Sequence, residues 1–130
     1  MNLIGADTNI LVRFLVRDVE SQAKRILVLL DKGHVFYINV VVLTELYWVL
    51  TKVYHYPKNS FVAVVDMLLE SNGFQLFDSE IVRSALSDYI HNTVEFPDCL
   101  IHQINLNKEM ITLTFDKKSS GLSNMQLLNE

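Results

Sequence analysis

Two aspartates stand directly after apolar runs of the type that form buried strands. Asp7 follows the run 3–6, and Asp116 follows the run 110–115. Ligands of parallel α/β sheets bind beyond the carboxyl ends of the strands, so both carboxylates would face one crevice if these strands are neighbours. Each aspartate can also be explained as a helix cap or a turn former, which is a common role for this residue.

Two further acids occupy helical positions. Glu45 is the only charged residue between His34 and Lys52, in a segment that is apolar nearly all round. We expect such a helix to be mostly buried, where an unpaired carboxylate is costly and a bound cation would compensate it. The alternatives are a salt bridge to a core arginine or a place on an exposed stripe with Lys52. Asp98 follows Pro97 in a first helical turn, where a favourable dipole interaction also explains it.

Carboxylates that cluster without partners repel one another, and a hard divalent cation removes that repulsion. Mg²⁺ prefers oxygen ligands and keeps several waters when it is bound. A site of this kind can polarise a phosphate, generate hydroxide from bound water and stabilise a leaving oxygen. The four acids therefore point to hydrolysis of a phosphodiester bond.

The elements that must position these acids follow from the apolar patterning. Strands are expected at residues 3–6, 35–38, 74–77 and 110–115, with a short last strand at 125–128. Helices are expected at residues 10–16, 19–32, 40–54, 57–71, 79–90 and 97–107. Asn39 and Ser79 are the expected N-caps of the third and fifth helices. The alternation predicts one α/β domain over 1–130, with a central parallel sheet of four to five strands wrapped by helices on both faces.

The composition excludes several classes of protein. The apolar fraction of 50% with 20% charged residues argues against disorder. The single cysteine, Cys99, cannot form an internal disulfide and suits a reducing compartment. The apolar stretch 36–50 is interrupted by polar residues and is shorter than the roughly 20 residues of a membrane span. The amino terminus lacks the pattern of a signal peptide, so we expect a cytoplasmic protein without membrane association.

The net charge of −4 argues against a broad electrostatic surface for nucleic acid. Divalent cations neutralise a cluster of acids when they bind, which answers part of this objection. The basic residues nearest the predicted site, which could contact phosphates, are Arg13, Arg17, Lys52, Lys117 and Lys118.

The segments around the four acids resemble the PIN-domain ribonucleases, and among them the VapC-type toxins of bacterial and archaeal toxin–antitoxin pairs. The matching segments are DTNILVR at 7–13, VLTELYWVL at 42–50, FPDCLI at 96–101 and LTFD at 113–116. Each segment is weakly specific alone, but the four occur in order and cover essentially the whole chain.

The resemblance implies a Mg²⁺-dependent ribonuclease, with Mn²⁺ as a possible substitute. It implies that the catalytic acids are Asp7, Glu45, Asp98 and Asp116. Of these, Asp7, Asp98 and Asp116 would hold the metal, and Glu45 would complete the cluster and orient the attacking water. Asn9 and Thr114 would support the site.

The resemblance also implies partners: RNA as the substrate, a second copy in a homodimer, and a small antitoxin protein whose tail blocks the crevice. Two departures from the family pattern occur. Pro97 stands where members usually carry a small residue, which bears on the angle of Asp98. Ser119 and Ser120 replace a stretch that more commonly contains alanine.

Other site residues have simpler explanations. Thr8 and Asn9 can cap the first helix. Cys99 and His102 lack the second pair of ligands that a zinc site needs. The aromatic residues of the third helix could stack on bases, but we expect them in the core or a dimer interface: Tyr47, Trp48 and Tyr54.

Other functional classes fit less well. Receiver domains pair two acids near the first strand, whereas Asp7 has no acidic neighbour. Aspartate-based phosphatases use two aspartates separated by one residue, and Asn9 occupies that place. Two alternatives stay open, namely a PIN-domain RNA-processing nuclease that is not a toxin and a non-catalytic RNA-binding module.

Overall fold

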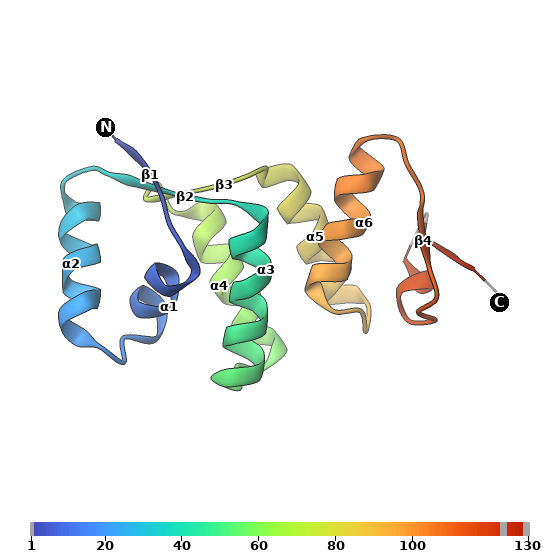
Figure 1. The fold of residues 1–130 in the computed structure, drawn as a ribbon, viewed down its shortest axis with the longest axis horizontal. Coiled ribbons are helices and arrows are strands. Elements are labelled where there is room, and N and C mark those ends of the chain that lie inside the picture. Colours follow the sequence, from blue (N-terminus) through green and yellow to red (C-terminus); the bar gives the residue numbers. More distant parts are fainter. Residues whose placement is uncertain (1, 123–124, 129–130) are drawn as a thin grey trace. The chain divides into compact units, whose positions relative to one another are not determined.

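The computed structural model describes residues 2–122 and 125–128 of the chain. It divides into two compact units, residues 1–77 and 78–130 (Figure 1). All strands in both units pair in parallel.

The first unit alternates strands with helices. Its elements are β1 (Leu3–Gly5), α1 (Thr8–Val16), α2 (Glu20–Asp31), β2 (Val35–Ile38), α3 (Val40–Trp48), the π-helix η1 (Val49–Val53), α4 (Lys58–Glu70) and β3 (Phe74–Leu76). The strand order is β1-β2-β3. Figure 1 shows the four α-helices on one side of this sheet, as right-handed crossovers require when the strand order is monotonic. The core lies between, where Ile38, Leu43 and Phe61 are fully buried.

Two strand-to-helix junctions of the first unit are fixed by side-chain caps. The Ile10 backbone N–H donates to Oδ1 of Asp7 over 3.0 Å, at the start of α1. The Val42 backbone N–H donates to Oδ1 of Asn39 over 2.9 Å, at the start of α3. Each cap satisfies an N–H group that has no partner within its helix. The caps therefore set where the residues that follow β1 and β2 lie.

The second unit contains two packed helices and a two-stranded sheet. Its elements are α5 (Ser79–His91), α6 (Phe96–Asn107), β4 (Thr112–Thr114), the 3₁₀ helix η2 (Ser119–Gly121) and β5 (Met125–Leu127). Tyr89 of α5 packs edge-on against Phe96 of α6, with ring centroids 5.8 Å apart. Asn105 of α6 donates from Nδ2 to Oγ1 of Thr112, which ties the end of α6 to β4.

The α/β fold class predicted from the sequence is confirmed, but the strands are distributed differently from the expected sheet of four to five strands. Within the described residues, three strands form one sheet and two form another. The four α-helices of the first unit lie on one side of its sheet (Figure 1). Apolar patterning identifies a strand, whereas strand pairing depends on contacts remote in sequence that no local pattern encodes. The prediction of a single domain over 1–130 stays a prediction.

One local prediction was wrong, and one predicted helix changes type along its length. Asp78, not Ser79, caps α5, because the Ile81 N–H donates to Oδ1 of Asp78 over 3.1 Å. The helix expected over 40–54 changes to a π-helix at Val49. None of the described helices combines the length and apolar character that crossing a membrane requires.

Candidate metal centre

Asp7 lies at the junction of β1 and α1, as the sequence predicted. Its side chain is exposed at the carboxyl end of the strand. Only Oδ1 is engaged by the cap to Ile10, and the described residues provide no partner for Oδ2. Asp7 can therefore cap α1 and still offer an oxygen to a ligand.

Glu45 of α3 lies next to this junction. Thr8 Oγ1 donates a hydrogen bond of 2.8 Å to Glu45 Oε1, across 37 residues of sequence. A hollow of about 290 Å³ is lined by Asp7, Thr8, Asn9, Glu45 and Val49. The first unit thus brings two of the predicted acids to one small cavity.

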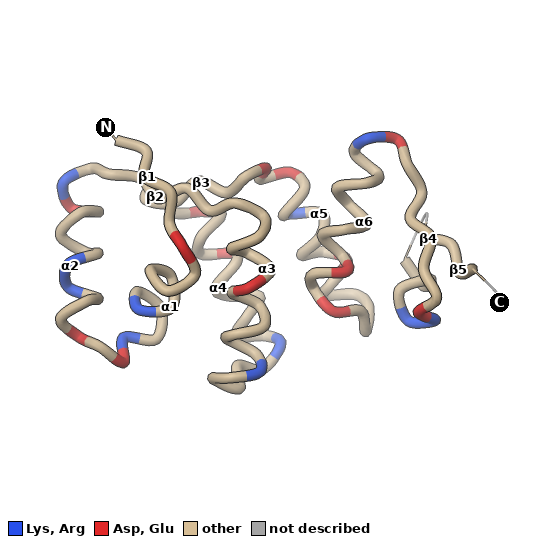
Figure 2. The backbone as a smooth tube through the Cα atoms, in the orientation of Figure 1, with Lys and Arg blue, Asp and Glu red and all other residues tan. Residues whose placement is uncertain are grey.

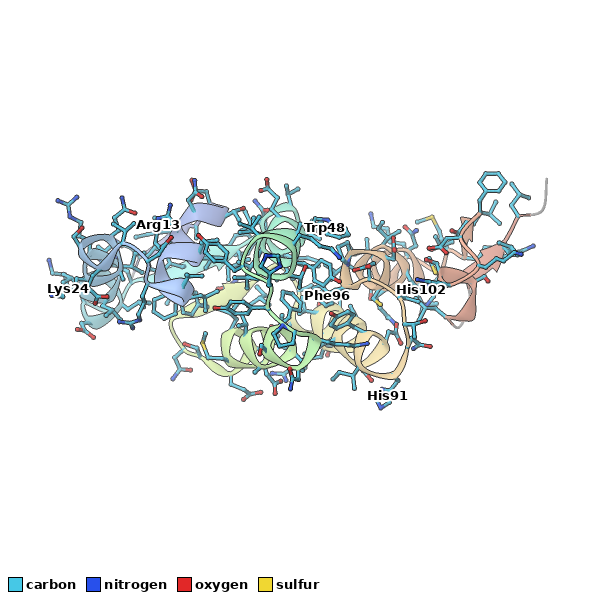
Figure 3. All side chains as sticks on the ribbon, turned by 90° about the horizontal axis from the view of Figure 1, so that it is seen from below. Arg13, Lys24, Trp48, His91, Phe96 and His102 are labelled. Carbon is cyan, nitrogen blue, oxygen red and sulfur yellow. The ribbon has the colours of Figure 1, made fainter. Side chains whose placement is uncertain are left out.

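The expectation that Glu45 is buried was wrong. Glu45 is exposed, and so are Val41 and Trp48 one turn before and after it, at 63% and 41%. The exposed stripe with Lys52, which was the alternative from the sequence, is the arrangement in the structure. Among the described residues Lys52 forms no ion pair with Glu45. Its ammonium lies 5.8 Å from the centre of the ring of Trp48, the residue labelled on α3 in Figure 3.

Asp98 and Asp116 belong to the second unit. Asp98 is half-buried in the first turn of α6. Burial raises the pKa of Asp98, and the negative charges of Asp116 and Glu95 raise it further. Asp98 and Asp116 therefore lie near enough to repel each other, as expected for acids that share a cation.

The loop after β4 fixes Asp116. Its Oδ1 accepts from the Lys118 backbone N–H over 2.9 Å, and its Oδ2 accepts from Ser119 Oγ over 3.1 Å. Thr114 Oγ1 accepts from the Asp116 backbone N–H over 3.0 Å. The predicted supporting residue Thr114 thus holds the backbone of the acid itself.

The described residues bring the predicted acids together in two pairs, one in each unit. Within residues 2–122 and 125–128, no three His, Cys, Asp or Glu side chains form a metal-binding group. None of the four carboxylates forms an ion pair in this part of the chain. Carboxylate oxygens without a cationic partner, two of them in mutual repulsion, are a donor set that suits Mg²⁺.

Two hydroxyl donors were missed as partners of the acids. Thr8 binds Glu45, and Ser119 binds Asp116. The Ser119 contact could have been considered, because it joins residues only three apart in the sequence. The Thr8 contact joins residues 37 apart, and no sequence pattern encodes it.

Three secondary candidates have structural roles in their own units. Cys99 and His102 are 0% and 1% exposed within the second unit, and no other ligand joins them in a described group. Tyr47 packs edge-on against Phe61 in the core of the first unit. These positions agree with the simpler explanations given by the sequence.

Comparison with known families places the geometry in context. A family model described as PIN domain matches residues 5–124. The PIN domain is a nuclease fold, and its members are typically metal-dependent enzymes that act on RNA. No curated protein matches the sequence. With the match covering nearly its whole length, the chain belongs to the PIN-domain family.

Proposed function

We propose that this protein is a Mg²⁺-dependent ribonuclease in which Asp7, Glu45, Asp98 and Asp116 act together. Asp7, Asp98 and Asp116 would hold the cation. Bound there, Mg²⁺ or Mn²⁺ supplies a Lewis acid that polarises the phosphate and lowers the pKa of a water. The observation that carries the proposal is that the four acids lie in two pairs without a cationic partner among the described residues. Asp7 and Glu45 line one hollow, and the charge of Asp116 raises the pKa of Asp98.

Residues of the first unit would orient the water that attacks the phosphate. Glu45 Oε1 is committed to the Thr8 hydroxyl, whereas Oε2 has no hydrogen-bond partner among the described residues. Oε2 would accept a hydrogen bond from the attacking water and orient it toward phosphorus. Thr8 would fix the rotation of the carboxylate, and Asn9 at the rim of the same hollow would hold the substrate in place.

The test is cleavage of a labelled single-stranded RNA by the purified protein. We expect cleavage with Mg²⁺, no cleavage with EDTA, and recovery when Mg²⁺ is returned in excess. Asp7→Asn should lower the rate at least about 100-fold while the fold is kept, because an asparagine oxygen still caps α1. Glu20→Gln, an exposed acid outside the proposed site, is the matched control and should cleave like wild type. A fully active Asp7→Asn protein would contradict the mechanism.

We further propose that the enzyme is the toxin of a type II toxin–antitoxin pair, and that it forms a homodimer blocked by a small antitoxin. The resemblance of the four acidic segments to VapC-type toxins supports this role. Regulated expression in a bacterial host should arrest growth, and expression of Asp7→Asn should not. Light scattering of the purified protein should give twice the 15.0 kDa chain mass.

The same experiments separate the alternatives. RNA cleavage in vitro without growth arrest would identify an RNA-processing nuclease. RNA binding without cleavage under any metal condition would identify a non-catalytic binding module. A short gene directly upstream whose product restores growth would identify the antitoxin.

A further inference from the structure

A second cavity in the first unit lies between α1 and α2. This groove of about 360 Å³ is lined by Asp7, Asn9, Ile10, Arg13, Gln22, Arg25, Ile26 and Leu29. On α2 the lining residues recur every three to four positions, which is the spacing of one helix face. The volume lies in the range of roughly 300–1,000 Å³ that is typical of small-molecule sites.

The groove combines an apolar floor with one uncommitted cation. Ile26 is 4% exposed, and Ile10 and Leu29 are half-buried beside it. Arg13 is held by Asp18, over 3.2 Å, and by Gln22. Arg25 is exposed and has no hydrogen bond or ion pair within residues 2–122 and 125–128. Its guanidinium is thus available for a ligand with an anionic group.

The groove adjoins the hollow of the candidate metal centre. Asp7 and Asn9 line both cavities, the groove on one side and the Glu45 hollow on the other. A ligand in the groove would therefore end beside a proposed metal ligand.

We propose that the groove between α1 and α2 binds one nucleotide of single-stranded RNA, adjacent to the phosphate that is cleaved. Arg25 contacts the phosphate on the far side of that nucleotide, and the base lies on the floor of Ile10, Ile26 and Leu29. This inference rests on the proposed ribonuclease function and names where its substrate lies.

The chemistry favours a nucleotide over an acidic peptide. The planar guanidinium of arginine matches the oxygens of a phosphate and binds two of them at once. The apolar floor of Ile10, Ile26 and Leu29 suits the apolar face of a base, and such a contact does not depend on which base it is. An acidic peptide carries several carboxylates. Among the described groove residues on α2, Arg25 is the only unpaired cation, so only one of those carboxylates would have a cationic partner.

The test compares two neighbouring charges on α2. Figure 2 shows that α2 carries several basic residues. Lys24 and Arg25 are both exposed, but only Arg25 lines the groove. Arg25→Gln and Lys24→Gln each remove one positive charge from the same helix. Binding of a fluorescein-labelled single-stranded RNA hexanucleotide is measured by anisotropy in EDTA, so that cleavage cannot interfere.

We expect Arg25→Gln to weaken binding about 10-fold or more, because a charged hydrogen bond to phosphate is lost. Lys24→Gln should weaken it less than about 2-fold. The slope of log affinity against log salt should fall by about 0.7 in Arg25→Gln, which corresponds to one phosphate of a single strand. In Mg²⁺, Arg25→Gln should raise KM and leave kcat nearly unchanged. Amide NMR shifts on adding the RNA should include Ile10, Ile26 and Leu29.

Equal effects of the two substitutions would overturn the proposal, since only general charge would then matter. Arg25-dependent binding of an acidic hexapeptide at equal or higher affinity would also overturn it. Failure of the nuclease proposal is distinguishable. If the wild-type protein never cleaves RNA but Arg25→Gln still weakens RNA binding more than Lys24→Gln does, the groove proposal stands and the nuclease proposal fails.

Discussion

At Glu45, a hydroxyl from a different helix holds one carboxylate oxygen, and the other oxygen has no hydrogen-bond partner in the part of the chain that the structure describes. The hydroxyl belongs to Thr8, which directly follows the proposed metal ligand Asp7. The two adjacent residues therefore have different proposed roles. Asp7 would bind the cation directly, whereas Thr8 would hold the Glu45 carboxylate in place. On the proposed mechanism Thr8 would act through Glu45, as a positioning residue and not a catalytic one.

Thr8→Val removes the donor and keeps the shape of the side chain. We expect kcat for RNA cleavage to fall about 10-fold with little change in KM, since a hydrogen bond to a charged group contributes roughly 1.5–3 kcal/mol at most. Thr8→Ser restores the donor and should restore kcat. Steady-state kinetics of the three proteins is the measurement. A Thr8→Ser protein as slow as Thr8→Val would exclude a positioning role for the hydroxyl.

The raised pKa of Asp98 predicts how stability depends on pH without metal. The folded-state pKa lies above the ordinary value of 3.8 because of burial, Asp116 and Glu95. The folded protein therefore holds this proton more tightly, and its stability falls as pH rises from 3.8 through the folded pKa.

Asp98→Asn should accordingly stabilise the protein in EDTA at pH 7, by less than about 1 kcal/mol because solvent screens a half-exposed carboxylate. The gain should shrink as pH falls toward 3.8. Thermal unfolding of wild type and variant from pH 4 to 7 measures it, with the exposed Asp66→Asn on α4 as control. A gain that grows on acidification would contradict the sign of the pKa shift.

Among the elements, α3 begins at a side-chain cap. Asn39 caps this helix, which carries Glu45, and the cap contributes about 1 kcal/mol. Asn39→Ala should lower the melting temperature by a few degrees. Asn59→Ala, at an exposed position in the first turn of α4, is the matched control and should not destabilise. Calorimetry of both variants distinguishes loss of the cap from a general effect of removing asparagine.

The sequence predicted the elements well and their non-local relations poorly. Local signals were sufficient for Asn39, because an asparagine before an apolar helical run is a recognisable cap. The change to a π-helix at Val49 was not foreseen, because π-helical turns are rare and the apolar pattern runs through them. The same limit applied to the site. The junction at Asp7 was predicted from adjacent residues, whereas the Thr8–Glu45 bond and the Arg25 groove require tertiary packing.

For the whole molecule, cation binding and folding should be linked. If acids of both units hold Mg²⁺, the ion binds the folded chain alone and stabilises it, by about 1.4 kcal/mol when free Mg²⁺ is about ten times Kd. The melting temperature of wild type should rise with Mg²⁺. Asp7→Asn from the first unit and Asp116→Asn from the second should each abolish most of that rise.

Asp66→Asn should keep the full effect of Mg²⁺, because this exposed acid lies outside the proposed site. Loss of the effect in only one of the two site variants would show that one pair of acids binds the ion without the other. That outcome would contradict the four-acid site and leave the fold unaffected.

The division of the acids between residues 1–77 and 78–130 has a consequence for synthesis. A ribosome completes Asp7 and Glu45 long before Asp98 and Asp116, so a growing chain holds only half of the proposed ligands. On this mechanism, a nascent or prematurely terminated product cannot digest the messenger that encodes it. On the proposed mechanism, activity would begin only after the chain through Asp116 has left the exit tunnel and folded.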